Sequence, residues 1–295
     1  MVRIAFLFLF FGMTGETSYA QGHLEELKER ISKLIGNHGI VAVAFKDINS
    51  GEELLFNANE SFHAASTMKT PVLIEVFRQA NQGKFSLKDS IVIKNEFESI
   101  VDGSVYALNA ADDSEQKLYE LIGKKRTISE LVTDMIIYSS NLATNMIIEL
   151  VGAPNVMKTM RELGADSIQV VRGVEDSKAF EKGLNNTTTA KDLMIIFEAL
   201  AKGKIISTGA CQQMIDILLH QQFNKIIPAR LPANVKVAHK TGNITGVLHD
   251  SGIVFLPGGH IYILVLLSKN IDNEETATNL LADISEMIYK YVTSR

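Results

Sequence analysis

The order of its apolar segments predicts an α/β (α+β) fold, with an antiparallel sheet from both chain ends, flanking helices and an inserted all-helical lobe. Strand-like runs with hairpin spacing lie between residues 40 and 57 and again between residues 234 and 268. Helical periodicity fills much of the chain between them. Because two halves of one sheet would enclose the middle segment, a cleft is expected where the sheet meets the helical lobe.

Each element rests on a local signal of period, cap or turn. The expected strands cover residues 40–46, 53–57, 234–239, 249–256 and 260–268. The expected helices cover residues 23–36, 66–82, 190–201, 208–221 and 274–291. A capping box at Thr127–Glu130 opens a further apolar segment that runs toward Leu150. Residues 103–125 and 168–186 have no clean period and are expected to be irregular.

The first twenty residues are typical of a secretory signal. Arg3 supplies a positive charge, residues 4–13 form an apolar run too short to span a bilayer, and Ser18–Ala20 fits the small-x-small cleavage pattern. Residues 1–20 are therefore expected to be removed, and residues 21–295 to form one catalytic domain of two lobes. The mature protein is expected to be periplasmic or secreted, with no membrane association.

Composition argues against several other classes of protein. The chain carries 29 Lys and Arg residues against 34 Asp and Glu residues, and it has no basic cluster. This balance argues against a nucleic-acid partner or a polybasic membrane surface. A single cysteine, Cys211, excludes an internal disulfide and every multi-cysteine metal site. No two histidines have a metal-ligand spacing, so neither a metal nor another cofactor is expected.

Three short motifs carry the candidate chemistry. Ser66–Lys69 is an S-x-x-K at a predicted helix start, where residues three apart share one face. A serine becomes nucleophilic when a base takes its proton, and a lysine can be that base if burial or nearby positive charge lowers its pKa. Ser139–Asn141 is an S-x-N in the helical middle. Lys240–Gly242 is the only K-T-G and ends a predicted strand.

These motifs are informative only as a set. A second S-x-x-K occurs at Ser114–Lys117 and a second S-x-N at Ser268–Asn270, so either motif alone is weak. In the order S-x-x-K, S-x-N, K-T-G, the chain resembles class A β-lactamases and related penicillin-binding serine hydrolases. The resemblance covers essentially the whole mature chain, including Asn145 and the Thr187–Thr189 run. It implies a β-lactamase/transpeptidase-like fold and a serine acyl-enzyme that needs no cofactor.

The resemblance implies how protons would move at the site. Ser66 would be the acylated nucleophile and Lys69 its proton acceptor. Ser139 would relay a proton toward the leaving nitrogen, and Asn141 would hydrogen-bond a substrate amide. Lys240 would keep the pKa of Lys69 low by repulsion between like charges.

The resemblance also assigns the K-T-G segment to substrate binding. Lys240 and Thr241 would bind the carboxylate of the substrate. The backbone N–H groups of Ser66 and Asn243 would form an oxyanion hole. Gly242 would allow the substrate backbone to approach closely.

The chain departs from the family pattern in two places. Ser140 stands where the S-D-N motif has Asp. Class A enzymes also carry a loop Glu that activates water, in an E-x-x-L-N preceded two residues earlier by Arg. Glu175 has an Arg three residues before it but no Leu-Asn after it, whereas Glu181 matches the string but runs directly into the threonine run. The spacing to that run favours Glu175, with Glu181 or neither as open alternatives.

This carboxylate decides the expected function. If Glu175 activates water, the acyl-enzyme is hydrolysed, and the protein is expected to be an exported serine β-lactamase. Without such a carboxylate, it is a D,D-carboxypeptidase or esterase of the same fold, or a penicillin-binding sensor that is acylated once. The expected partner is a small β-lactam or a D-Ala-D-Ala-like substrate, bound by a monomer. The substrate spectrum depends on loops such as 101–117 and 243–248, which no motif covers.

Overall fold

The computed structural model describes residues 14–294. Residues 1–13 of the predicted signal segment (residues 1–20) lie outside the described residues. Residues 14–20 form the first turns of helix α1 (Thr14–Ile35). No helix between residues 14 and 294 has both the length and the apolar character needed to cross a membrane.

The predicted helices and strands occur in the expected order, and further short elements lie between them. The α-helices are α1 (Thr14–Ile35), α2 (Lys69–Asn81), α3 (Ile128–Ile137), α4 (Asn141–Val151), α5 (Ala153–Glu162), α6 (Ser177–Glu181), α7 (Ala190–Ala201), α8 (Thr208–Leu218) and α9 (Glu274–Thr293). The strands are β1 (Ile40–Asp47), β2 (Glu53–Phe56), β3 (Phe62–His63), β4 (Ser90–Val92), β5 (Phe97–Glu98), β6 (Val105–Tyr106), β7 (Lys125–Thr127), β8 (Thr187–Thr188), β9 (Lys236–Ile244), β10 (Val247–Phe255) and β11 (Ile261–Lys269). Three 3₁₀ turns are η1 (Ala65–Met68), η2 (Ala110–Asp112) and η3 (Gln116–Leu121).

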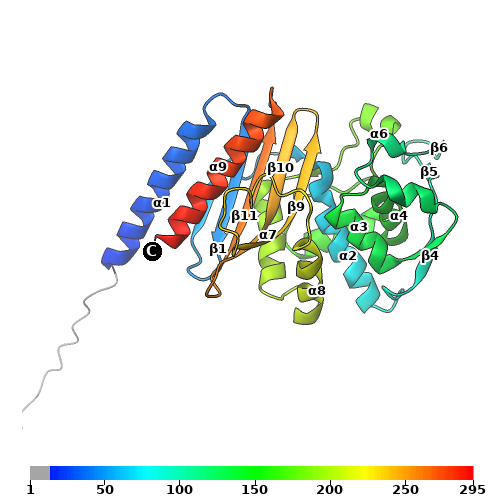
Figure 1. Cartoon of the computed structure of the whole chain (residues 1–295), viewed down its shortest axis with the longest axis horizontal. Helices are drawn as coiled ribbons and strands as arrows, with labels where there is room; N and C mark the ends of the chain where they lie inside the picture. Colours follow the sequence, from blue (N-terminus) through cyan, green and yellow to red (C-terminus); the bar gives the residue numbers. More distant parts are fainter. Residues whose placement is uncertain (1–13, 295) are drawn as a thin grey trace, which may run out of the picture.

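One antiparallel sheet joins the two ends of the chain, as predicted. Its strand order is β2-β1-β11-β10-β9, so the first long strand pairs with the last. Ala42 of β1 lies opposite Leu267 of β11, for example. This pairing leaves β9, which carries the K-T-G motif, at the edge that faces the helical lobe (Figure 1).

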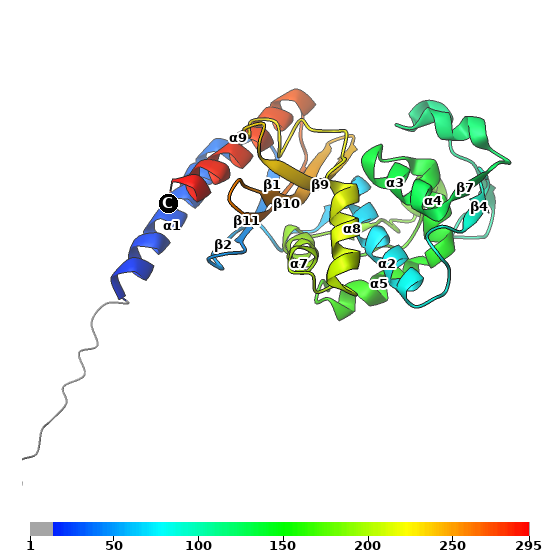
Figure 2. The same ribbon diagram turned by 60° about the horizontal axis from the view of Figure 1, so that its bottom comes forward.

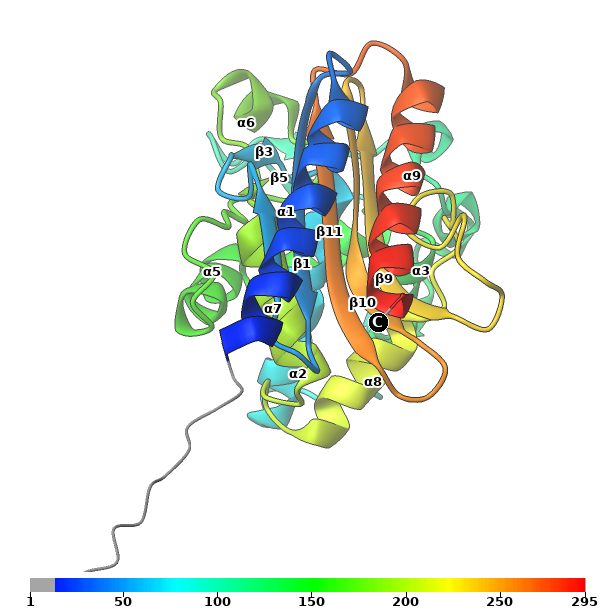
Figure 3. The same ribbon diagram turned by 90° about the vertical axis from the view of Figure 1, so that its left-hand side faces the viewer.

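Both faces of the sheet are buried, and the strands alternate between two cores. In β1, Val41, Val43 and Phe45 belong to the core beneath α1 and α9. Ala42 and Ala44, which point the other way, belong to the larger core shared with the helical lobe. Figure 3 shows α1 and α9 side by side across the first of these faces.

The helical lobe is built around α2 from the chain between β2 and β9, whereas α7 of this stretch packs against β1, β10 and β11 of the sheet (Figure 2). The predicted capping box is present at the start of α3, where the Thr127 hydroxyl accepts from the Glu130 N–H and the Glu130 carboxylate accepts from the Thr127 N–H. The apolar segment beyond it divides into α3 and α4, because the chain turns at Ser139, which has a left-handed φ of 59°.

The structure corrects two local expectations. The expected helix over 66–82 begins as the 3₁₀ turn η1 and becomes α-helical at Lys69. The K-T-G motif does not end its strand. Strand β9 continues to Ile244, because it pairs along its whole length with β10 and presents its polar side chains to the cleft rather than breaking.

Candidate active site

The S-x-x-K motif occupies the junction of η1 and α2. Ser66 lies within η1 and Lys69 begins α2. Side chains three residues apart eclipse one another in a 3₁₀ turn, so both lie on one face, as the motif predicts. A buried hydrogen bond stabilises the turn, because the Thr67 hydroxyl donates to the Ala64 carbonyl at 2.6 Å.

Lys69 is fully buried and directed at the S-x-N turn. Its Nζ donates to the Ser139 carbonyl at 2.6 Å, to Ser139 Oγ at 3.1 Å and to Asn141 Oδ1 at 3.1 Å. Burial lowers the pKa of Lys69 to about 7, although the carboxylates of Asp113 and Glu175 oppose this shift. A large fraction of Lys69 is therefore neutral near pH 7 and able to accept a proton.

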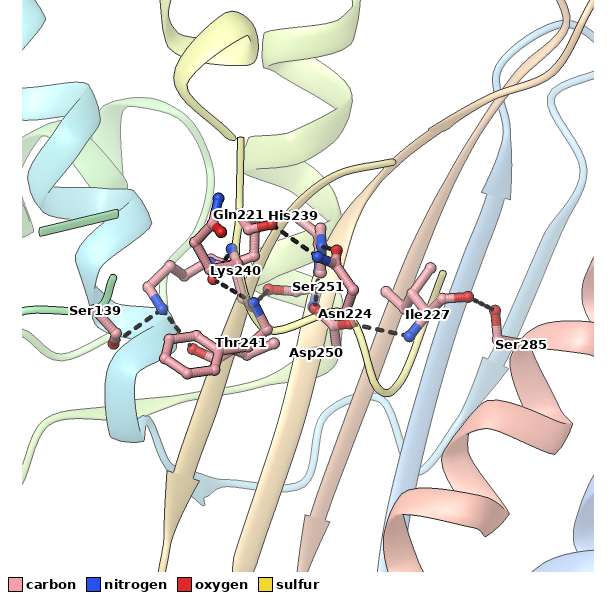
Figure 4. Close-up of polar contacts among 12 residues, drawn as sticks. Ser139, Gln221, Asn224, Ile227, His239, Lys240, Thr241, Asp250, Ser251 and Ser285 are labelled. Atoms are coloured by element: carbon pink, nitrogen blue, oxygen red, sulfur yellow. Dashed lines mark hydrogen bonds and ion pairs between the residues drawn. The ribbon is translucent and has the colours of Figure 1, made fainter. Parts of the chain in front are cut away.

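Lys240 completes a bridge between the two lobes. It is fully buried, and its Nζ donates to Ser139 Oγ at 3.1 Å and to the Thr241 carbonyl at 2.9 Å. Figure 4 shows this lysine reaching from β9 toward Ser139. Burial and the nearby Lys69 charge hold the pKa of Lys240 well below its ordinary value.

The lowered pKa of Lys69 has one of the two causes that the sequence left open. Burial is the largest cause at Lys69, whereas the family resemblance implied repulsion from Lys240. At Lys240, burial is again the largest cause of the lowered pKa, and repulsion from the Lys69 ammonium adds to it.

Gly242 allows β9 to pass close to the nucleophile. A Cβ atom at this position would lie 3.1 Å from Ala65 Cβ, 3.2 Å from Ser66 N and 3.3 Å from the Ala64 carbonyl oxygen. A side chain at this position would therefore force β9 or η1 to shift by a few tenths of an ångström, in addition to hindering the predicted approach of the substrate.

A cavity of about 450 Å³ opens beside these motifs. Its lining includes Ser66, Ser139, Asn141, Thr241 and Asn243, so the structure brings residues of all three motifs to one hollow. Its remaining lining residues are Asp112, Ser114, Gln222, Phe223, Asn224, Lys225, Ile226, Leu248, Glu274 and Thr278. This size suits a small-molecule substrate.

Glu175 reaches the site through Asn141. The Asn141 Nδ2 donates to Glu175 Oε1 at 2.7 Å, while its Oδ1 accepts from Lys69. Partial burial raises the pKa of Glu175, and the Asn141 hydrogen bond opposes this rise. Glu175 does not line the cavity itself. It therefore lies beside the Lys69 end of the motif cluster, within one side chain of it.

The loop that carries Glu175 is fixed by buried polar contacts. Asn145 accepts from the Val174 N–H at 2.6 Å and donates to the Val174 carbonyl at 3.0 Å. The buried Arg172 guanidinium donates to carbonyls of Gly173 and Leu184. These contacts fix the backbone that directly precedes Glu175 and join it to the end of the loop at Leu184. Glu181, the alternative candidate, ends the short helix α6 with an exposed side chain, and no contact joins it to the motif residues in the described chain.

Three of the six non-glycine residues with a left-handed φ in the described chain lie at this site. Ala65, Ser139 and Glu175 have left-handed φ values of 44°, 59° and 61°. Such conformations cost of the order of 1–3 kcal/mol each in residues other than glycine, and they persist where surrounding contacts enforce them. Ser139 and Glu175 are predicted catalytic residues, and Ala65 directly precedes the predicted nucleophile Ser66. The strained conformations therefore lower the stability of the fold at the positions that place these side chains.

One wall of the cavity, formed by residues 222–226, was not predicted from the sequence. Residues 222–226 follow α8 and are held by a buried network that Figure 4 shows beside Lys240. His239 contacts Asp250 Oδ1 at 2.8 Å and Asn224 Oδ1 at 3.0 Å, and Asp250 also accepts from the Ile227 N–H. No local pattern marks these residues, because the contacts join separate elements.

Comparison with known proteins agrees with this geometry. The model of the β-lactamase enzyme family matches residues 26–292. This chain belongs to the β-lactamase enzyme family. Membership of this family supports a hydrolase that acts on β-lactams, and the β-lactamase/transpeptidase-like fold predicted from the motifs is confirmed.

Individual β-lactamase relatives are distant but extend over most of the chain. The extended-spectrum β-lactamase PER-1 of Pseudomonas aeruginosa is 23% identical over 276 residues, which cover 90% of this chain and 87% of that protein. A crystal structure of a β-lactamase from Sphaerobacter thermophilus is 25% identical, with a TM-score of 0.77, over 92% of this chain and 98% of that chain. The structure of PBP-A is also 25% identical, with a TM-score of 0.79, over 92% and 97%.

Gly242→Ala should slow β-lactam turnover by about 10- to 100-fold, less than the full loss of an oxyanion donor. The added methyl group would push β9 away from η1 and move the Ser66 N–H. Steady-state kinetics check this, with Gly209→Ala as the matched control, since a Cβ at Gly209 meets nothing within 4 Å. Equal activity of both variants would show that the approach of β9 does not matter.

Proposed function

We propose that the protein is an exported, monomeric serine β-lactamase of class A, which hydrolyses the β-lactam amide through an acyl-enzyme on Ser66. The observation that carries the proposal is the hydrogen-bonded array of Lys69, Ser139 and Lys240 beside Ser66. Two buried lysines that share one serine hydroxyl, with one pKa near 7, suit proton transfer better than structural support.

Acylation follows from this array. Neutral Lys69 takes the Ser66 hydroxyl proton as Oγ attacks the β-lactam carbonyl carbon. The N–H groups of Ser66 and Asn243 stabilise the negative charge on the carbonyl oxygen. When the ring C–N bond breaks, the Ser139 hydroxyl protonates the nitrogen and is itself reprotonated from Lys69. Lys240 and Thr241 bind the substrate carboxylate.

Deacylation then requires a base for water. Glu175, held by Asn141, takes a proton from a water molecule as that water attacks the ester carbonyl. The ester C–O bond breaks as the proton held by Glu175 returns to Ser66 Oγ. This step regenerates the serine hydroxyl and the Glu175 carboxylate, and the product acid leaves. The raised pKa of Glu175 brings it nearer to the working pH, which favours general base catalysis.

A second function of the same fold is a D,D-peptidase or a penicillin-binding protein with a long-lived acyl-enzyme. The similarity to PBP-A supports this alternative, because PBP-A and the β-lactamase from Sphaerobacter thermophilus are equally similar to this chain, at 25% identity. The two functions differ in deacylation. The placement of Glu175 beside Asn141 favours the β-lactamase.

Turnover of a chromogenic cephalosporin by the mature protein, followed together with intact mass, tests the proposal. We expect sustained hydrolysis of many substrate equivalents per enzyme. A single stoichiometric adduct without turnover would instead support the penicillin-binding alternative. Absence of both adduct and hydrolysis would reject Ser66 acylation by β-lactams.

A further inference from the structure

Outside the three motifs, one buried carboxylate contacts the predicted site. We propose that Asp113 is a positioning residue, whose carboxylate binds the start of α4 and thereby holds Asn141 between Lys69 and Glu175. This role in turnover rests on the β-lactamase function proposed above. The placement of Asn141 by Asp113 is a structural claim that can be tested without turnover.

Asp113 lies between η2 and η3, and 4% of its surface is exposed. Its Oδ2 accepts from the Asn141 N–H and the Leu142 N–H, each at 2.9 Å. The same oxygen accepts from the Tyr119 hydroxyl at 2.9 Å and lies 3.4 Å from the Ser140 hydroxyl. Four donors therefore converge on one buried carboxylate oxygen.

These contacts lie at a helix start, where backbone N–H groups lack partners within the helix. Ser140 caps α4 locally by accepting from the Ala143 N–H at 3.2 Å. Asp113 satisfies the two earlier N–H groups and adds the negative charge that a helix N-terminus favours. The carboxylate missing from the middle of the S-x-N motif is thus supplied from a loop 27 residues earlier in the chain.

Asn141 links the Asp113 carboxylate to the predicted proton-transfer groups Lys69 and Glu175. Its backbone is bonded to Asp113, while its side chain accepts from Lys69 and donates to Glu175. A shift of the Asn141 backbone would therefore disturb both predicted proton-transfer groups at once. Displacements of about 1 Å at such sites can cost about 100-fold in rate.

The charge of Asp113 also acts on these groups. It raises the pKa of Lys69 and that of Glu175 against the other influences on them. The charged or polar groups that face Glu175 are Asn141, Asp112, Asp113 and Lys69. Removal of the Asp113 charge should therefore move both pKa values downward.

Three variants separate these effects. Asp113→Asn removes the charge but keeps the shape and one acceptor oxygen. Asp113→Ala removes the support altogether, and Asp113→Ala combined with Ser140→Asp returns a carboxylate at the N-cap. Asp166→Asn, at an exposed position, is the matched control. For each variant, we would measure kcat and KM, the pH profile of kcat/KM, and a crystal structure.

We expect Asp113→Asn to lower kcat by about 10- to 100-fold with a small change in KM, and to move the acidic limb of the pH profile to lower pH. In Asp113→Ala, Asn141 should leave Lys69 and Glu175, and the added Ser140→Asp should restore part of both geometry and rate. An unmoved Asn141 with wild-type kcat in Asp113→Ala would overturn the proposal, as would no recovery at all in the double variant. If the wild type shows no turnover, the proposed function fails, but the crystal structures still decide whether Asp113 positions Asn141.

Discussion

Replacement of Ser66 by alanine should abolish turnover, with kcat for a chromogenic cephalosporin falling by at least about 10⁴-fold. The nucleophile cannot be replaced by the remaining groups, because Lys69 and Ser139 move protons but form no bond to the carbonyl carbon in the proposed mechanism. Intact mass should show no covalent adduct. Substrate should still bind, since Lys240, Thr241 and the cavity wall are unchanged.

The fold should survive this change. Ser66 is half-buried in η1, and the turn is held by the Thr67 hydroxyl rather than by the Ser66 side chain. A melting temperature close to that of the wild type would show this. Ser90→Ala, at an exposed strand position, should leave both turnover and mass labelling intact. Adduct formation by Ser66→Ala would mean that another residue is the nucleophile.

Glu175→Gln should convert the enzyme into one that is acylated but barely turns over. Acylation requires Lys69 and Ser139, whereas release of the acyl group requires a base for water. Loss of that base should slow deacylation by about 10²- to 10⁴-fold. Rapid mixing should then show a burst of one equivalent, and intact mass should show the acyl-enzyme accumulating. The glutamine retains a side-chain oxygen for the Asn141 amide, so the loop should stay in place.

Glu181→Gln is the matched control, since it alters the other carboxylate that the sequence left open. It should turn over substrate at the wild-type rate, because Glu181 lies on α6 and, unlike Glu175, makes no described contact with the motif residues. If Glu181→Gln accumulates the acyl-enzyme and Glu175→Gln does not, the two assignments exchange. Unimpaired deacylation in both variants would mean that neither residue is the base.

Much of the fold could be predicted because it depends on local period. The continuous apolar run of β1 and the apolar repeat of α7 are properties of neighbouring residues, and α7 has the expected bounds of 190–201. The short pairs β3–β8 and β4–β7 were not expected. Segments of two or three residues carry too little pattern to be recognised, and they form because the lobe brings their chains together.

Part of the candidate site could also be predicted. The order of the three motifs gave a set of residues, most of which the structure gathers at one cavity, although their catalytic roles stay predictions. Asp113 gave no signal. It stands in a polar stretch without period, and its importance comes from bonds to Asn141 and Leu142, far along the chain. The cavity wall at residues 222–226 was missed for the same reason.

The sequence by itself therefore determined the family, the order of elements and the three motifs, because short spacings and periodic burial are written in adjacent residues. Only the tertiary structure decided that Glu175, rather than Glu181, contacts Asn141. It alone showed that burial is the main cause of the lowered Lys69 pKa, and that a distant carboxylate supports the S-x-N turn. Hydrogen bonds and desolvation act through space, so they depend on which segments the folded chain brings together.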